Sequence, residues 1–418
     1  MKLTDLPSEL IEEIFVHCDP IDVSKAAQTG STLRGIIYFS KDSKLWRELY
    51  LMQPFDDPRK CLSHDGRPKS TPILWKDELQ RIVRARTIVT AEDGLATVKP
   101  GELEEVLETF IMLVCYVPSL TQYGIRTGQL SLNLAWVVAM FEGGFLDRLE
   151  ERDSSTSAER QLISRLHSYY GLTKRDLKPQ SRVDSRAFVY SLRNYSPENE
   201  YGPLLPTGEV NWEHVQALHH VVSMHLVDLS GDEDFMFAIF PMSLPFTQIG
   251  VPENVVLDEE KDWAGVAGSW TVHFCFCDHR DLLRFNEAST PRLDTSLFED
   301  PDFREEFRSL DVKLCVTQTQ KDPQHPTRPI IYFFGEMQEP STSTMTGNVQ
   351  MTKDNQVQWH FVSGDQGNTI WSSEGIQIGG LQSSFGVLGS WTTIFHDGDD
   401  PVGPFWMHKH NSEGPELP

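Results

Sequence analysis

The segment VAGSWTVHFCFC, residues 266–277, decides the fold of the C-terminal half of this chain. From Val272 onward, apolar side chains alternate with histidine and cysteine, so the valine and both phenylalanines share one face of a predicted strand. The segment VLGSWT, residues 387–392, repeats its first half. In both segments a glycine lets the backbone approach closely, and the nearby tryptophan can fill an apolar end. We interpret them as two strands of one barrel. Two repeated units are the alternative, because such short segments do not establish duplication.

Further short β-rich runs surround these two segments. The predicted strands are residues 235–240, 269–277, 312–319, 329–334, 356–362 and 386–395. Clusters of turn-forming residues such as GDQGN and HDGDDPVGP separate them. Because many short strands with turn signals are typical of barrels and sandwiches, we expect a β-barrel-like domain over residues 228–412.

The part of the chain before the barrel is predicted to be mainly helical over residues 73–227. Leu103, Val106, Leu107 and Phe110 recur there at helical spacing. Further helices are expected at residues 130–149, 158–170 and 212–227. Together with the barrel, these helices predict an α+β fold.

The first 52 residues are predicted to form short helices of their own. A helix starts at LPSEL, residues 6–10, where proline and an early acid suit the first turn. Leu10, Ile11, Ile14 and Phe15 then fall on one face of that helix. Such a small unit buries little surface alone, so it gains most by inserting apolar residues into a partner's groove. Packing of this unit on the rest of the chain is the alternative.

Residues 53–72 join this small unit to the helical region. They are rich in proline, glycine and charged residues, which predicts a linker or a long loop.

The order of residues in the first unit resembles the F-box family. The family pattern runs Leu-Pro-x-Glu-Leu, then Ile-Phe, an Asp-hydrophobic pair, a Leu-Arg pair and Leu-Trp. This chain matches it with Leu6, Pro7, Glu9, Leu10, Ile14, Phe15, Asp22, Val23, Leu33, Arg34, Leu45 and Trp46. The resemblance covers residues 3–50 of 418, and it departs at Cys18, where the family usually has a leucine. It implies an F-box at residues 1–52.

The resemblance implies the role of a substrate-receptor, or adaptor, subunit of an SCF-type cullin–RING E3 ubiquitin ligase. The partner implied is the linker protein of the ligase core, bound by Leu6, Pro7, Leu10, Ile14 and Val23. Trp46 would support the fold. The C-terminal region would recruit an unknown protein substrate for ubiquitination. Other subunits perform the ubiquitin chemistry, so we expect a non-catalytic chain with no catalytic residues and no cofactor.

The C-terminal half carries two weaker resemblances. Residues 371–375, 386–392 and 400–406 resemble the C-terminal module of uncharacterised fungal F-box proteins. The Gly-x-Trp elements are similar to those of lipocalin-type barrels. The second resemblance keeps open a lipocalin-like barrel that binds a small molecule and has an F-box appended. An enzyme whose catalytic residues are scattered along the sequence is a further alternative.

The composition of the chain limits the classes of partner and the cellular compartment that we expect. The chain has 37 basic and 61 acidic residues and a formal charge of −24, which disfavours nucleic acid. Six cysteines spread over 418 residues favour a reducing compartment. No secretory signal and no apolar run long enough to span a bilayer are visible, so we expect a cytoplasmic or nuclear protein without membrane contact.

Three stretches contain candidate metal ligands, and we expect none of them to bind a metal. His273, Cys275, Cys277 and His279 would share one strand face, but they would lie ~6–7 Å apart along it, too far for tetrahedral zinc. The histidines around residue 220 are His214, His219, His220 and His225, and they lack the i, i+4 spacing of a helical metal pair. The stretch HDGDD, residues 396–400, lacks the calcium-loop spacing and is predicted to be an acidic turn.

Overall fold

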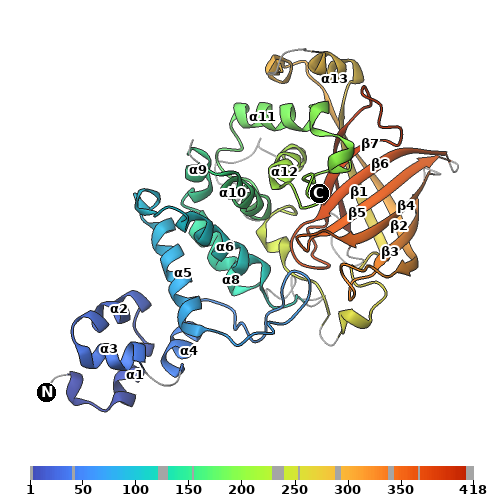
Figure 1. Cartoon of the computed structure of the whole chain (residues 1–418). Helices are drawn as coiled ribbons and strands as arrows, with labels where there is room; N and C mark the ends of the chain where they lie inside the picture. The colour runs from blue at the N-terminus through green and yellow to red at the C-terminus, as the bar shows by residue number, and fades with distance from the viewer. Residues whose placement is uncertain are drawn as a thin grey trace.

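The computed structural model describes residues 3–39, 43–120, 130–152, 155–227, 240–252, 255–287, 293–337, 343–365 and 368–410. Helices occupy the N-terminal part, and the strands close into an antiparallel barrel in the C-terminal part (Figure 1). The predicted α+β fold with a barrel-like C-terminal domain is therefore confirmed.

Four short helices form a lobe at the N-terminal end of the molecule (Figure 1). They are α1 (Ser8–Val16), α2 (Pro20–Gln28), α3 (Ser31–Phe39) and α4 (Lys44–Leu51), preceded by the 3-10 turn η1 (Leu3–Asp5). Trp46 is buried between them and donates its indole N–H to the Ile37 carbonyl at 2.9 Å. This tryptophan therefore supports the fold of the lobe, as the resemblance implies.

The helical middle is built from helices of 6 to 16 residues that pack around aromatic side chains. Its helices are α5 (Trp75–Thr90), α6 (Glu102–Cys115), α8 (Leu132–Phe141), α9 (Phe145–Glu150), α10 (Ser157–Tyr170), α11 (Pro179–Val189) and α12 (Trp212–Leu226). The single helix predicted over residues 130–149 is two helices, because Gly144 adopts a φ of 74° between them. That left-handed conformation is accessible to glycine, and Gly144 is the N-cap of α9 after α8 has ended at Phe141.

Residues 53–72 contain no named helix or strand, in keeping with the long loop that was one of the two predictions, and this loop is packed against the helices. Phe55 is buried against the Trp136 ring, with the ring centres 5.1 Å apart. The Asp56 carboxylate accepts hydrogen bonds at 3.1 Å from the backbone N–H groups of Leu132 and Asn133. It thereby satisfies the unpaired N–H groups at the start of α8. One continuous hydrophobic core runs from the N-terminal lobe into the barrel, because buried apolar side chains line this whole route.

Eight strands of the described chain form a closed barrel in which each strand pairs with the next and β1 also pairs with β8. They are β1 (Gly268–Cys277), β2 (Glu305–Gln320), β3 (Ile330–Met337), β4 (Ser343–Met351), β5 (Val357–Asp365), β6 (Asn368–Gln377), β7 (Val387–Thr393) and β8 (Gly403–Lys409). Predicted strands at 269–277, 312–319, 329–334, 356–362 and 386–395 fall on β1, β2, β3, β5 and β7. The strand predicted at 235–240 lies outside the described residues except for Phe240, which is not in a strand.

The two Gly-Ser-Trp segments lie on β1 and β7 of this one barrel, which confirms that interpretation. Trp270 stands opposite Lys409 at the last residue of β8, and Trp391 stands opposite Gly403 at its first residue. The two tryptophans therefore occupy opposite ends of the barrel. Both are buried, and each donates its indole N–H to a backbone carbonyl.

The helical middle covers one side of the barrel. Helix α12 packs on β7 and β8 (Figure 1). The outward side chains of this side, such as Leu388 and Trp406, are consequently buried. Much of the outer face of β2 remains exposed. The outer face of the barrel is therefore buried on β7 and β8, beneath the helices, and largely exposed to solvent on β2.

Candidate functional site

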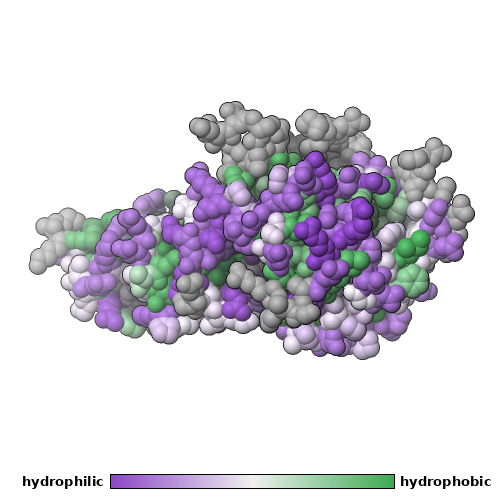
Figure 2. All heavy atoms as spheres, turned by 90° about the horizontal axis from the view of Figure 1, so that it is seen from above, coloured by the Kyte–Doolittle hydropathy of each residue, from purple (hydrophilic) through white to green (hydrophobic). Residues whose placement is uncertain are grey.

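Helix α1 divides its apolar side chains between the core and the surface. Ile11 and Phe15 are buried in the N-terminal lobe, whereas Leu10 and Ile14 are 52% and 43% exposed. Pro7 is also exposed, and Leu6 is half-buried. We call Leu6, Pro7, Leu10 and Ile14 the α1 face. Hydrophobic surface is visible over this lobe at the left of Figure 2.

The α1 face follows from helix geometry. Residues at i and i+4 lie above one another, so Ile11 and Phe15 point inward together and Leu10 and Ile14 point outward together. The single apolar face predicted from the sequence is therefore two adjacent stripes, one in the core and one in solvent. Isolated exposed apolar residues are ordinary, but a contiguous set on one helix marks an interaction surface.

Val23 does not belong to the α1 face, which corrects its predicted role in partner binding. Its side chain is fully buried between the helices of the lobe. A buried valine contributes to the stability of the lobe and reaches no partner in this conformation. The other four predicted contact residues lie in the turn before α1 and along α1 itself.

The lobe is held to α5 by packing and by charge. The Tyr50 ring meets the Trp75 ring edge-on, with their centres 5.5 Å apart. Arg86 of α5 donates to the Asp19 carboxylate at 3.0 Å. These contacts involve none of the four residues of the α1 face.

The barrel interior is filled by large side chains. The inward residues include Trp270, Phe333, Trp359, Phe361 and Phe405, all of them buried. Trp359 contacts both Trp270 and Phe333, and Phe361 meets Phe405 edge-on. An eight-stranded barrel has an interior just wide enough for side chains or one small ligand. In this barrel, aromatic side chains occupy that space.

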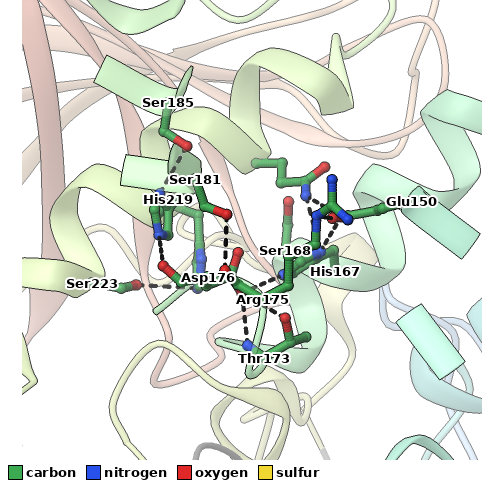
Figure 3. Close-up of polar contacts among 12 residues, drawn as sticks. Glu150, His167, Ser168, Thr173, Arg175, Asp176, Ser181, Ser185, His219 and Ser223 are labelled. Carbon is green, nitrogen blue, oxygen red and sulfur yellow. Dashed lines mark hydrogen bonds and ion pairs between the residues drawn. The ribbon is translucent and has the colours of Figure 1, made fainter. Parts of the chain in front are cut away.

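A network of charged and polar groups lies between the helices of the middle region (Figure 3). The His167 ring donates to Glu150 at 2.6 Å and to Asp176 at 2.8 Å. Burial alone lowers the pKa of His167, but the charges and hydrogen bonds of Asp176 and Glu150 more than offset it, so that pKa is raised well above its usual value. Burial raises the pKa of both carboxyl groups, and His167 reverses that effect and lowers them.

Other histidines of the helical middle have separate partners. His220 Nδ1 lies 2.7 Å from Ser185 Oγ, and His220 Nε2 lies 2.9 Å from the Asp176 carbonyl oxygen. His219 contacts the Met242 carbonyl, and His225 contacts Glu305. Because His219, His220 and His225 each contact a different partner, these α12 histidines do not form one site.

The histidine- and cysteine-rich stretch forms strand β1 as far as Cys277. Burial raises the pKa of Cys277 to about 12 and that of Cys275 well above its usual value, so both thiols are protonated at neutral pH. The prediction that His279 shares their strand face is wrong. Strand β1 ends at Cys277, and Asp278 caps the next helix, α13 (His279–Asn286). In the part of the chain that the structure describes, no three His, Cys, Asp or Glu side chains are arranged to hold a metal ion.

None of the helices within the described ranges is long and apolar enough to cross a bilayer. Comparisons with protein-family models, with curated proteins and with solved structures find no match for this chain.

Two features of the structure were not predicted from the sequence. The His167 network joins residues from α9, α10 and the loop after α10, and no motif announces it. A pocket of about 530 Å³ lies between residues 60–68, residues 118–119 after α6, residues 251–252 and 255–258, and Arg328. Its charged residues are scattered over nearly 270 positions of the sequence, so only the fold assembles them.

Proposed function

We propose that this chain is a substrate-receptor, or adaptor, subunit of an SCF-type cullin–RING E3 ubiquitin ligase. The observation that carries the proposal is the α1 face, where residues of the F-box pattern lie exposed on a small helical lobe. The occupant of this face is the linker protein of the ligase core, through an apolar groove that receives Leu10 and Ile14.

The energetics support a docking role for the α1 face. Full burial of a leucine or isoleucine side chain contributes roughly 1.5–3 kcal/mol. Leu10 and Ile14 have more than a third of their surface in water, although the buried side of the same helix already packs a core. A partner that covers them thus adds apolar burial without refolding the lobe.

The barrel and the helical middle would recruit the protein substrate. Two exposed aromatic side chains, Trp371 at the start of β6 and Phe395 after β7, project near one end of the barrel. Tryptophan is favoured at binding hot spots, which makes this end the candidate contact for substrate. Ubiquitin transfer itself would belong to other subunits, in the cytoplasm or the nucleus.

The double substitution Pro7→Ala and Leu10→Ala is expected to weaken binding of the linker protein at least about 30-fold. This is the change in Kd that corresponds to ~2 kcal/mol, the usual threshold of a hot spot. The measurement is a titration of purified full-length chain with the linker protein by calorimetry.

Leu74→Ala supplies the control for this titration, since Leu74 is 63% exposed at the start of α5 and lies outside the α1 face. It should leave the affinity within about twofold, because residues outside a hot spot are close to neutral. Equal affinity of the double variant and the wild type, with unchanged thermal unfolding, would show that the α1 face does not bind the linker protein.

A lipocalin-like barrel that binds a small molecule is the second candidate function. The closed eight-stranded topology favours this second function. The Lys409 ammonium, which lies 5.8 Å from the centre of the Trp270 ring at one end of the barrel, also favours it. The aromatic filling of the interior favours the receptor instead. An apolar ligand that quenches the fluorescence of buried Trp359 would support the lipocalin-like function.

A further inference from the structure

A pocket of about 530 Å³ lies outside the barrel, where the segment after the N-terminal lobe meets the connections into the barrel. Pockets of roughly 300–1,000 Å³ are the usual size for small-molecule sites, and they occur preferentially where structural units meet. This pocket therefore has the volume and the position of a ligand site.

The polar lining of this pocket is mainly cationic. Among the described lining residues, Lys60, Arg67 and Arg328 are cationic and Asp258 is acidic. Arg67 also pairs with the Asp65 carboxylate at 3.3 Å. The whole chain carries a formal charge of −24, so a cluster of three cations stands out from the rest of the molecule. Such a local concentration of positive charge attracts an anion, although the net negative charge of the whole chain repels it.

Arg328 is the buried member of this set, with a side chain only 2% exposed. It forms an ion pair with Asp258 and donates at 2.9 Å to the Asp65 carbonyl oxygen. Its Nε is buried and has no hydrogen-bond partner in the described chain. An unpaired donor on a buried guanidinium is costly, and a ligand acceptor or a bound water at this position relieves that cost.

The remaining lining is apolar. Leu62, Pro118, Val251, Val255 and Leu257 contribute to the walls. Val256, which also lines the pocket, is 57% exposed. Apolar walls with a few converging charged groups are the usual composition of a site for an organic ligand.

The walls are fixed by contacts between distant parts of the chain. Leu62 and Val117 exchange backbone hydrogen bonds of 2.9 and 3.1 Å. Arg67 donates to Thr327 Oγ1 at 2.7 Å. Gly66 adopts a φ of 80°, and a Cβ at that position would come within 2.2 Å of Leu257. The pocket is therefore preformed, which lowers the entropic cost of binding.

We infer that this pocket binds a small organic anion with an apolar body, such as an aromatic or aliphatic carboxylate, sulfonate or phosphate. The anionic head lies toward Arg328, Arg67 and Lys60, and the apolar body lies along Leu62 and Val255. Because the ligand contacts both the segment after the lobe and the entry to the barrel, it stabilises their junction. This inference does not rest on the proposed function.

The test is a calorimetric titration of the full chain with 8-anilinonaphthalene-1-sulfonate, which joins an apolar ring system to one sulfonate. The double substitution Lys60→Gln and Arg67→Gln is expected to raise its Kd at least about tenfold, because it removes two charges that face the anion. It leaves the buried Arg328 in place, and thermal unfolding verifies that the variant is folded.

A matched control removes the same charge elsewhere. Arg280→Gln with Lys313→Gln changes two exposed cations that do not line the pocket, and it should leave the Kd within about twofold. The neutral analogue N-phenyl-1-naphthylamine should bind the wild type at least about tenfold more weakly than the sulfonate. Equal affinities of the two double variants, or of the two probes, would overturn the inference.

Discussion

Trp270→Ala is expected to lower the free energy of unfolding by about 3–5 kcal/mol, the usual cost of truncating a buried large aromatic residue. Trp270 fills one end of the barrel, where its ring centre lies 5.2 Å from that of Trp359. Its indole N–H donates to the Val266 carbonyl at 2.8 Å, and the substitution leaves that carbonyl without its partner. A loss of this size is a large part of a typical stability of ~5–15 kcal/mol.

Denaturant unfolding of the full chain measures this loss, with Trp371→Ala as the matched control. Trp371 is 38% exposed and meets the Trp391 ring edge-on at 5.3 Å, so its removal should cost only about 1 kcal/mol. If both variants lost the same small amount, Trp270 would not support the barrel end. Loss of substrate binding without loss of stability would then place it on a recognition surface.

His167→Gln is expected to cost about 3–5 kcal/mol, because it removes the positive charge that buried Asp176 and partly buried Glu150 share, although Arg175 still pairs with Glu150 at 3.3 Å. The imidazolium donates to Glu150 and Asp176 from its two nitrogens, whereas a glutamine side chain carries no charge. His17→Gln is the control. The exposed His17 ring lies 4.0 Å from Glu13, and its replacement should change the stability by less than about 0.5 kcal/mol.

The effect of His167→Gln depends on pH with a definite sign. The folded-state pKa of His167 is raised, so its contribution is full below the usual value of 6.5 and is lost as pH rises through the raised pKa. The folded-state pKa values of Glu150 and Asp176 are lowered, so their contribution is full above the usual 4.5 and 3.8 and is lost in acid. The difference in unfolding free energy between wild type and variant should therefore be largest between about pH 5 and pH 6.5. A difference in unfolding free energy that does not change with pH would contradict the assignment of His167 as positively charged and of Glu150 and Asp176 as negatively charged.

Regular patterns in the sequence predicted much of the barrel. Alternation in β1 and the Gly-Ser-Trp segment in β7 identified both strands, because a strand with one buried face has a period of two. The strands β4, β6 and β8 were not predicted. Most residues of β4 are threonine, serine, glycine or amides, and β8 opens with Gly403 and Pro404, which reads as a turn. Their strand conformation comes from pairing with neighbours rather than from their own preference.

The candidate sites were predicted less completely, for a different reason. Local spacing identified Leu10 and Ile14 as part of an apolar helix, but it did not separate them from Ile11 and Phe15, since the direction of the core is a tertiary property. Val23 carried a partner role by resemblance alone, and packing places it inside the lobe. The pocket around Arg328 combines side chains from four separate parts of the chain, so no local pattern reveals it.

The pairing of β1 with β8 sets an order of events during synthesis on the ribosome. Strand β1 emerges early, but its partner on one side, residues 403–409, is among the last strands to be made. Until then β1 and β7 present unpaired edges, which are prone to pair with other chains. A nascent chain interrupted anywhere between β7 and β8 would hold an open sheet. We therefore expect such prematurely terminated chains to aggregate. Once β8 is present, it pairs with both β1 and β7, so neither strand keeps an unpaired edge.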